Sequence, residues 1–310
     1  MSDVRSQIDE MAQRLFREKV NRAVLEAAAA GRWPEELWEA AVDTGLTSSM
    51  VPEDKGGVGL GWWDVYFVIR ATGRYCAPVP LAETIVASSL LARVKIPVPK
   101  GVLSIQPGDP ADRLKLSRVG GNWRLSGFAC GIPWGRAADY VVLNARHDKK
   151  HYRIMAPTTG IQVTPGRNIA GEPRDRLKFD AVQVEAAPII RKSSIDCSRT
   201  LGALARAAQM SGVFEAILQE TVRYVNERKQ FGRPLARFQV VQQNLAVMAE
   251  EVAAARVATE AAFIATDRGD STIAVAAAKV RTYAAVSLVT SIAHQLLGAM
   301  GFTREHHLHQ

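Results

Sequence analysis

Apolar residues recur at helical spacing near both ends of the chain and give way to short extended runs in the middle. Within the first 95 residues, helical spacing covers 20–30, 35–42 and 82–91. A glycine-rich loop at 51–61 lacks the Gly-Lys-Ser/Thr sequence of a phosphate loop, and a chain-reversing turn and a ligand-facing segment explain it equally well. We expect an all-α N-terminal domain over residues 1–98.

The middle of the chain has the residue pattern of a β domain. Short runs of β-branched and aromatic residues are separated by Gly, Pro and Asp. Within the last run, the apolar phase changes between Phe179 and Val182, which is typical of a bulge. We expect a small antiparallel barrel or sandwich over residues 99–192, with strands at 102–105, 123–126, 140–144, 152–155, 162–164 and 177–184.

The last third is again helical. Helical spacing covers 203–228 and 240–268, and after a Gly269-Asp270-Ser271 turn it continues to about Ala299. Long, alanine-rich helices of this kind pack closely, so we expect a four-helix-bundle-type C-terminal domain over residues 193–310.

Composition narrows the class of protein. The 310 residues are 47% hydrophobic and 23% charged, which is ordinary for a folded globular protein. The net charge of +8 is spread along the chain, so it does not indicate a nucleic-acid surface; an anionic ligand such as CoA and a plain solvated surface explain it equally well. With no signal-peptide core and no run of eighteen apolar residues, we expect a cytoplasmic protein that does not span a membrane.

Residues that commonly bind metals form no ligand pattern. The cysteines, Cys76, Cys130 and Cys197, lack CxxC spacing, and His306, His307 and His309 match no strong motif. We expect neither a disulfide framework nor a metal site.

The segment Arg228-Lys229-Gln230-Phe231-Gly232 carries the strongest chemical signal. A guanidinium is suited to a phosphate, glutamine side chains can bond ribityl or adenine edges, and phenylalanine offers an apolar face. Near the C-terminus, Gly298 and Gly301 allow the backbone to approach a ligand closely. By spacing alone, these residues are explained equally well without a ligand, with Arg228 as a surface charge and the glycines as a helix C-cap.

Five segments, in order, resemble the acyl-CoA dehydrogenase family: 44–59, 121–139, 177–184, 228–239 and 294–302. The resemblance implies an acyl-CoA dehydrogenase-like fold with helical, β-barrel and helical domains. It also implies an FAD cofactor, an acyl-CoA substrate, an electron carrier and a homo- or hetero-oligomer in which FAD lies across a subunit interface. The FAD-binding positions that it implies are Arg228, Gln230, Phe231, Leu235, Gln239, Gln295, Leu296, Gly298 and Ala299.

The chain departs from this family where the chemistry takes place. The aromatic-Ile-Thr run beside the flavin ring is replaced by Gly131, Ile132 and Pro133, with Trp134 as the candidate substitute, and the Thr-Glu-Pro-x-x-Gly-Ser segment is missing. Of the family's two positions for a catalytic glutamate, one falls on Gly202 and the other about fifteen residues after Glu305, beyond Gln310. No catalytic residue is therefore assigned, and we expect either a truncated sequence or a base supplied by a partner.

Three functions remain open. The first is an FAD-dependent subunit of a hetero-oligomeric acyl-CoA dehydrogenase for fatty acid or sterol degradation, similar to bacterial enzymes for sterol side chains. The second is a structural subunit without chemistry, and the third is a flavin monooxygenase of the same fold.

Overall fold

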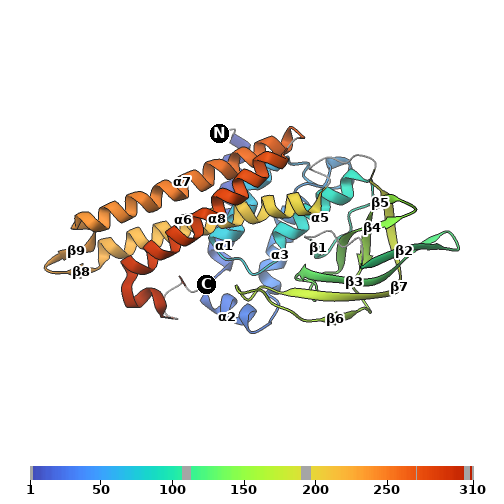
Figure 1. The fold of residues 1–310 in the computed structure, drawn as a ribbon, viewed down its shortest axis with the longest axis horizontal. Helices are drawn as coiled ribbons and strands as arrows, with labels where there is room; N and C mark the ends of the chain where they lie inside the picture. Colours follow the sequence, from blue (N-terminus) through green and yellow to red (C-terminus); the bar gives the residue numbers. More distant parts are fainter. Residues whose placement is uncertain (1–2, 107–112, 190–196, 270, 304–307, 309–310) are drawn as a thin grey trace.

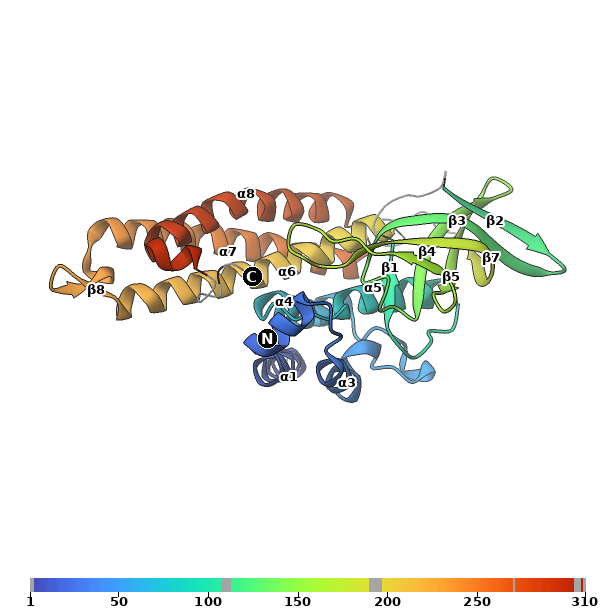
Figure 2. The same ribbon diagram turned by 90° about the horizontal axis from the view of Figure 1, so that it is seen from below.

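The computed structural model describes residues 3–106, 113–189, 197–269, 271–303 and 308. Three long helices extend to one side, the β-sheet lies at the other, and the N-terminal helices pack beneath them (Figures 1 and 2). This order of helices, barrel and helices confirms the predicted fold class.

The N-terminal part consists of five α-helices and two short 3-10 helices. The predicted helices at 20–30, 35–42 and 82–91 are present as α2, α3 and α5, whereas α1 and α4 had no separate prediction. Helix α4 is buried on nearly all sides, and its buried residues include the polar Arg70 and Thr72. The bounds are α1 Asp3–Lys19, α2 Arg22–Ala29, α3 Glu35–Asp43, η1 Leu46–Ser48, η2 Glu53–Lys55, α4 Trp62–Arg74 and α5 Leu81–Arg93.

The middle part is a closed barrel, but it is not purely antiparallel as expected, because β1 and β2 each pair with β4 in parallel. Strands pair in the ring β4–β2–β3–β7–β5 and back to β4, while β1 lies beside β4 and β6 beside β7. The predicted bulge is confirmed: Asp180 and Ala181 lie opposite Ser126 alone, and Ala181 has a φ of +49°. The bounds are β1 Leu103–Ile105, β2 Leu114–Val119, β3 Asn122–Pro133, β4 Tyr140–His147, β5 Lys150–Pro157, β6 Gln162–Thr164 and β7 Arg174–Pro188.

The C-terminal part contains the three long helices that the pattern predicts. A small hairpin connects the first two, and a 3-10 turn follows the third. The bounds are α6 Ser198–Glu227, β8 Lys229–Gln230, β9 Arg233–Pro234, η4 Leu235–Arg237, α7 Gln239–Asp267, α8 Thr272–Leu297 and η5 Gly298–Phe302. Among the described residues a fourth long helix of this domain is absent, and α4 packs against α6 and α7 instead.

Two glycines allow α4 and α6 to cross at close range. A Cβ at Gly73 would lie 2.0 Å from the Gln209 carbonyl oxygen, and one at Gly212 would lie 2.1 Å from the Arg70 carbonyl oxygen. The carboxylate of Asp267 caps the start of α4 by accepting the backbone N–H groups of Trp62 and Trp63 at 2.6 and 2.9 Å. The helical domains are therefore joined through backbone contacts.

Helix α8 with η5, Thr272–Phe302, has the length and apolar character of a membrane-spanning helix. One third of its most apolar window is buried inside the protein, where α8 packs against α6 and α7. The core helix of a soluble bundle has the same properties, so this is weak evidence for a membrane.

Candidate functional site at the junction of the three domains

The start of α6 faces the end of β1. A Cβ at Gly202 would lie 3.6 Å from Ile105 Cδ1, an ordinary van der Waals distance. The amide oxygen of Gln106, the next residue, is buried and has no hydrogen-bond partner among the described residues. This contact between α6 and β1 therefore has an unpaired acceptor close to a position where a side chain would fit but none is present.

The end of β3 lies beside β1, since the Ser104 hydroxyl donates to the Pro133 carbonyl. Gly131 has a φ of +67°, and nothing lies within 4 Å of the position its Cβ would take. Pro133, two residues later, has no N–H to donate. The space that an aromatic side chain would cover in the resembling family is thus open in this chain.

Trp134 does not take over that role by contacts within the described residues. Its ring meets Trp33, from the N-terminal helices, edge to face with centroids 6.3 Å apart. Its backbone N–H donates to the Pro173 carbonyl at 3.2 Å. The side chain thus belongs to the contact between the barrel and the α2–α3 connection.

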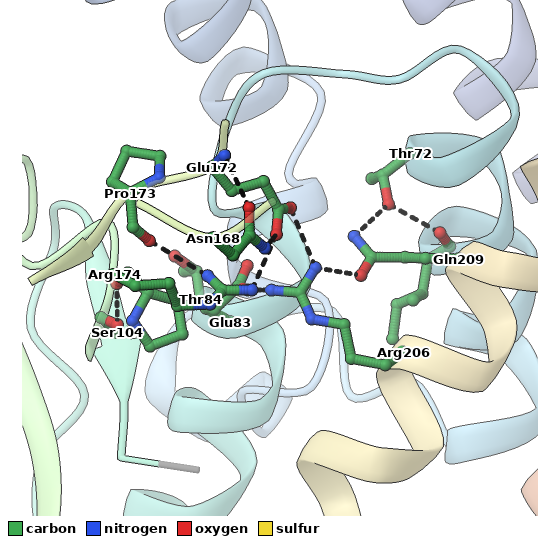
Figure 3. Close-up of polar contacts among 12 residues, drawn as sticks. Thr72, Glu83, Thr84, Ser104, Asn168, Glu172, Pro173, Arg174, Arg206 and Gln209 are labelled. Atoms are coloured by element: carbon green, nitrogen blue, oxygen red, sulfur yellow. Dashed lines mark hydrogen bonds and ion pairs between the residues drawn. The ribbon is translucent and has the colours of Figure 1, made fainter. Parts of the chain in front are cut away.

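A cluster of four charged side chains, which we call the charged junction, connects the three domains (Figure 3). Arg206 of α6 forms ion pairs with Glu83 of α5 and, at 3.1 Å, with Glu172 of the loop before β7. Arg174 of β7 pairs with the other oxygen of Glu172 at 2.7 Å. Because two carboxylates face two guanidiniums, the cluster is internally neutralised and neither carboxylate is available as a base.

Neutral side chains complete the charged junction. The Asn168 amide donates to Glu172 at 2.9 Å, Arg206 donates to the Gln209 amide oxygen at 2.7 Å, and Gln209 donates to the Thr72 hydroxyl at 3.0 Å (Figure 3). These bonds satisfy groups that burial would otherwise penalise.

Burial and charge act in opposite directions on the pKa values of the cluster. Burial favours the neutral form of Glu172, but Arg206 and Arg174 outweigh it and hold the pKa of this carboxyl below its usual value. For Arg174, burial and the neighbouring Arg206 lower the pKa of the guanidinium. The junction is therefore a set of mutually dependent charges.

The Arg228 segment lies at the far end of the long helices (Figure 1). Arg228 is the C-cap of α6, and its side chain is exposed and makes no ion pair with any described residue. The ring of Phe231 is 90% exposed, at the tip of the β8–β9 turn. The Leu235 N–H donates to the Arg228 carbonyl at 2.9 Å, which fixes the base of the hairpin. Gln230 and Gln239 are also exposed.

The second predicted segment ends α8. Gln295 is exposed and Leu296 is half-buried in the last helical turn. Gly298 caps the helix with a φ of +57° and donates its N–H to the His294 carbonyl, and Ala299 follows on the surface. Between this segment and the Arg228 segment, the described residues form no hydrogen bond, ion pair or ring contact. One chain thus presents two separate, exposed parts of the predicted FAD site.

Other predicted positions have different outcomes. Glu305, His306, His307 and His309 lie outside the described residues.

The charged junction was missed by sequence reasoning because its partners are distant in sequence: Arg206 lies 123 residues from Glu83 and 34 from Glu172. No local pattern could have indicated it.

Comparisons with known proteins cover most of the chain. Residues 2–95 match the acyl-CoA dehydrogenase N-terminal domain and residues 199–310 the acyl-CoA dehydrogenase C-terminal domain. Acyl-CoA dehydrogenase FadE27 of Mycobacterium tuberculosis is 31% identical over 69% of this chain, and the match covers 62% of that relative's length.

Solved structures extend the likeness over the full fold. A variant of the Tcur3481–Tcur3483 steroid acyl-CoA dehydrogenase superposes with a TM-score of 0.87 and 26% identity, covering 98% of this chain and 90% of that one. The ChsE4–ChsE5 complex from Mycobacterium tuberculosis has the same TM-score with 23% identity, covering 100% and 90%. On its fold, its two matching domains and its relatives, this chain belongs to the acyl-CoA dehydrogenase family.

Proposed function

We propose that this chain is the FAD-binding subunit of a two-subunit acyl-CoA dehydrogenase, in which a partner of the same family supplies the catalytic base. The observation that carries the proposal is the Arg228 segment, which is exposed and lacks an ionic partner within the described chain. The reaction is the α,β-dehydrogenation of an acyl-CoA thioester in the cytoplasm, with electrons passed to a carrier protein.

The residues at the tip of the long helices fit the pyrophosphate and sugar of FAD. Arg228 has a free guanidinium for a phosphate, and Gln230 and Gln239 have exposed amides for hydroxyl or ring edges. The positive φ of Gly298 exposes backbone at the end of α8. The Arg228 segment and the end of α8 are separate within one chain. Each therefore completes an FAD site with the other segment of a second subunit.

The residues around the ends of β1 and β3 fit the flavin ring less completely. The buried Gln106 oxygen can accept a ring N–H, and the open space beside Gly131 can admit a flat ring. Pro133 offers no hydroxyl or N–H to it. When bound, FAD supplies the two-electron oxidant for the desaturation.

The proton on the acyl Cα needs a carboxylate in a dry pocket. At the position of α6 that faces Ile105, this chain has Gly202, and the nearby Glu83 and Glu172 are held in ion pairs. A base from the partner is consistent with the similarity to a steroid acyl-CoA dehydrogenase whose structure is named for two proteins.

Exposed apolar side chains on α7 and α8 support association with another subunit. They include Val247, Val257, Ile273, Val280 and Tyr283. Helices α7 and α8 pack against each other, and exposed apolar groups that gather on a folded protein mark interaction sites. We call these five residues the α7–α8 apolar face.

The direct test is to express the chain alone and together with a candidate partner subunit of the same family. We expect a yellow complex that dehydrogenates acyl-CoA only when both subunits are present. In that complex, Arg228→Ala should weaken flavin binding by about 1.5–3 kcal/mol, the value of a hydrogen bond to a charged group. Flavin absorbance per complex measures this.

Arg268→Ala is the matched control, because Arg268 is also exposed and makes no ion pair with the described residues. Undiminished flavin content in Arg228→Ala would contradict the proposed pyrophosphate site. Full activity of this chain as a homo-oligomer would contradict the two-subunit enzyme.

A second candidate, a subunit that supports its partner without chemistry, is favoured by Gly131, Pro133 and Gly202 together with the neutralised charged junction. It predicts that the purified complex has no flavin absorbance attributable to this chain. Flavin that is lost on Arg228→Ala would therefore reject it.

A further inference from the structure

We propose that a cavity between the N-terminal helices and the barrel binds a mononucleotide, a planar base with one or two phosphates. The cavity has a volume of about 420 Å³ and lies between the α2–α3 connection, the β3–β4 turn and the β6–β7 loop. Small-molecule sites usually measure about 300–1,000 Å³, so this one suits a mononucleotide better than a dinucleotide. It is separate from the Arg228 segment, and none of the four ionic residues of the charged junction lines it.

Three tryptophans form the apolar side of the cavity. Trp33 lies between Trp38 and Trp134, with ring centroids 5.8 and 6.3 Å away. Trp38 is buried, whereas Trp33 and Trp134 are partly accessible from the cavity. Accessible indole rings bind bases by stacking, regardless of the base identity.

Trp134 adopts an unusual backbone conformation. Its φ is +53°, a region that bulky residues rarely occupy and that costs about 1–3 kcal/mol. The carbonyl of Trp134 accepts N–H groups from Ala137 and Ala138, and its own N–H donates to Pro173. The turn is thus held in a strained form that keeps the indole at the cavity.

Three arginines supply the polar side, and each retains unused donors. Arg136 binds the buried Asp175 through Nε and Nη2, and Arg167 binds the Ala29 carbonyl through Nη1 at 2.8 Å. The remaining terminal nitrogens, Arg136 Nη1 and Arg167 Nη2, make no hydrogen bond with the described residues, and the same holds for the whole Arg32 side chain. Because two of the guanidiniums are anchored at one end, their free donors are oriented for a phosphate.

Two carboxylates also line the cavity, Glu35 and Asp139. Asp139 is engaged, since its Oδ2 accepts the Val102 N–H at 2.7 Å. Glu35 is exposed and makes no ion pair with the described residues. It can accept a hydrogen bond from a ribose hydroxyl, whereas the phosphate is expected at the Arg32 and Arg167 side.

Calorimetric titration of the flavin-loaded, partner-bound protein tests this site with ADP, AMP, adenosine and CoA. We expect saturable binding of ADP and AMP at one site per chain, and at least about tenfold weaker binding of adenosine because the charge-assisted bonds to phosphate are lost. Arg32→Gln and Arg167→Gln should each weaken ADP binding by about tenfold or more, while Arg268→Gln should leave it unchanged.

The CoA titration identifies the source of the nucleotide. Competition between CoA and ADP indicates the nucleotide end of CoA, and ADP binding without competition indicates a free nucleotide; both support the site. Absence of ADP and AMP binding, or binding that neither arginine variant weakens, would overturn it, whether or not CoA binds elsewhere in the complex.

An Arg228→Ala variant separates this proposal from the proposed function, because FAD itself contains an ADP group. We expect the variant to lose flavin and to bind ADP as before. Loss of ADP binding in Arg228→Ala would mean that ADP occupies the flavin site, which overturns the cavity proposal and leaves the proposed function standing.

Discussion

Gly202 occupies one of the two positions at which the resembling family has its catalytic glutamate. A substitution there therefore tests whether this chain can act as an enzyme. A Cβ there would make only an ordinary contact with Ile105, so Gly202→Glu can place a carboxylate beside the end of β1 without a backbone clash. If the two-subunit proposal holds, we expect the variant to restore acyl-CoA-dependent reduction of a dye acceptor to a complex whose partner has lost its own catalytic base. A positioned general base contributes about 10²–10⁴-fold.

Gly202→Gln is the control, because it has nearly the same shape but cannot accept the proton. Equal activity of the Glu and Gln variants would show that the gain does not come from a base. No gain in a flavin-loaded complex that carries Gly202→Glu would show that the acyl group does not lie beside Gly202.

Glu172 should make the stability of the fold depend on pH. Its pKa in the folded state lies below the ordinary value of 4.5, so it contributes stability that is fully present above that value and is lost as the pH falls toward the folded-state pKa. We expect Glu172→Gln to cost about 1.5–3 kcal/mol at pH 7, the value of hydrogen bonds to charged groups. The cost should shrink below pH 4.5 in urea unfolding.

The matched control is Glu227→Gln, since Glu227 forms an exposed pair with Arg223 at 3.7 Å, and exposed pairs contribute about 0–1 kcal/mol. A cost of Glu172→Gln that stays constant from pH 7 to pH 3 would mean that the Glu172 charge does not stabilise the junction.

At the scale of elements, the crossing of α4 and α6 depends on the absence of side chains. We expect Gly212→Ala to destabilise the protein by about 1–3 kcal/mol through overpacking, because its Cβ would lie 2.1 Å from a backbone oxygen of α4. Gly202→Ala, on the same helix, has room for its Cβ and should stabilise by about 0.5–1 kcal/mol. Urea midpoints that do not differ between the two variants would refute this account of the crossing.

The elements differ in how well their sequences predicted them. Helices α2, α3 and α5 and most strands were predicted because their local patterns are clear, and the bulge of β7 was visible as a phase change. Helix α4 was missed because Val65–Gly73 is buried on all faces. Strand β2 was missed because its alternation rests on little more than Leu114 and Leu116.

The same distinction applies to the site. Motifs formed by neighbouring residues, such as Arg228 to Gly232, could be recognised directly, and their role remains a prediction. The charged junction and the cavity beside Trp33 and Trp134 depend on contacts between domains, and no periodicity within one segment encodes these contacts.

At the scale of the whole molecule, the α7–α8 apolar face should hold the partner subunit. Val280 and Tyr283 are 69% and 75% exposed on α8 and three residues apart, so they lie on one side of the helix. We expect a Val280→Glu, Tyr283→Glu double variant to dissociate the complex, because charges would be buried there without partners. Light scattering after size exclusion would show a smaller mass.

Val119→Glu is the control, because Val119 is similarly exposed but lies at the end of β2 in the barrel. The proposal that FAD lies between subunits adds a second requirement: the double variant should lose flavin together with its partner, although Arg228 is intact. Dissociation with flavin retained would place the whole FAD site within one chain. An unchanged mass would mean that the partner binds at another surface and that partner binding does not explain the exposed apolar residues of α8.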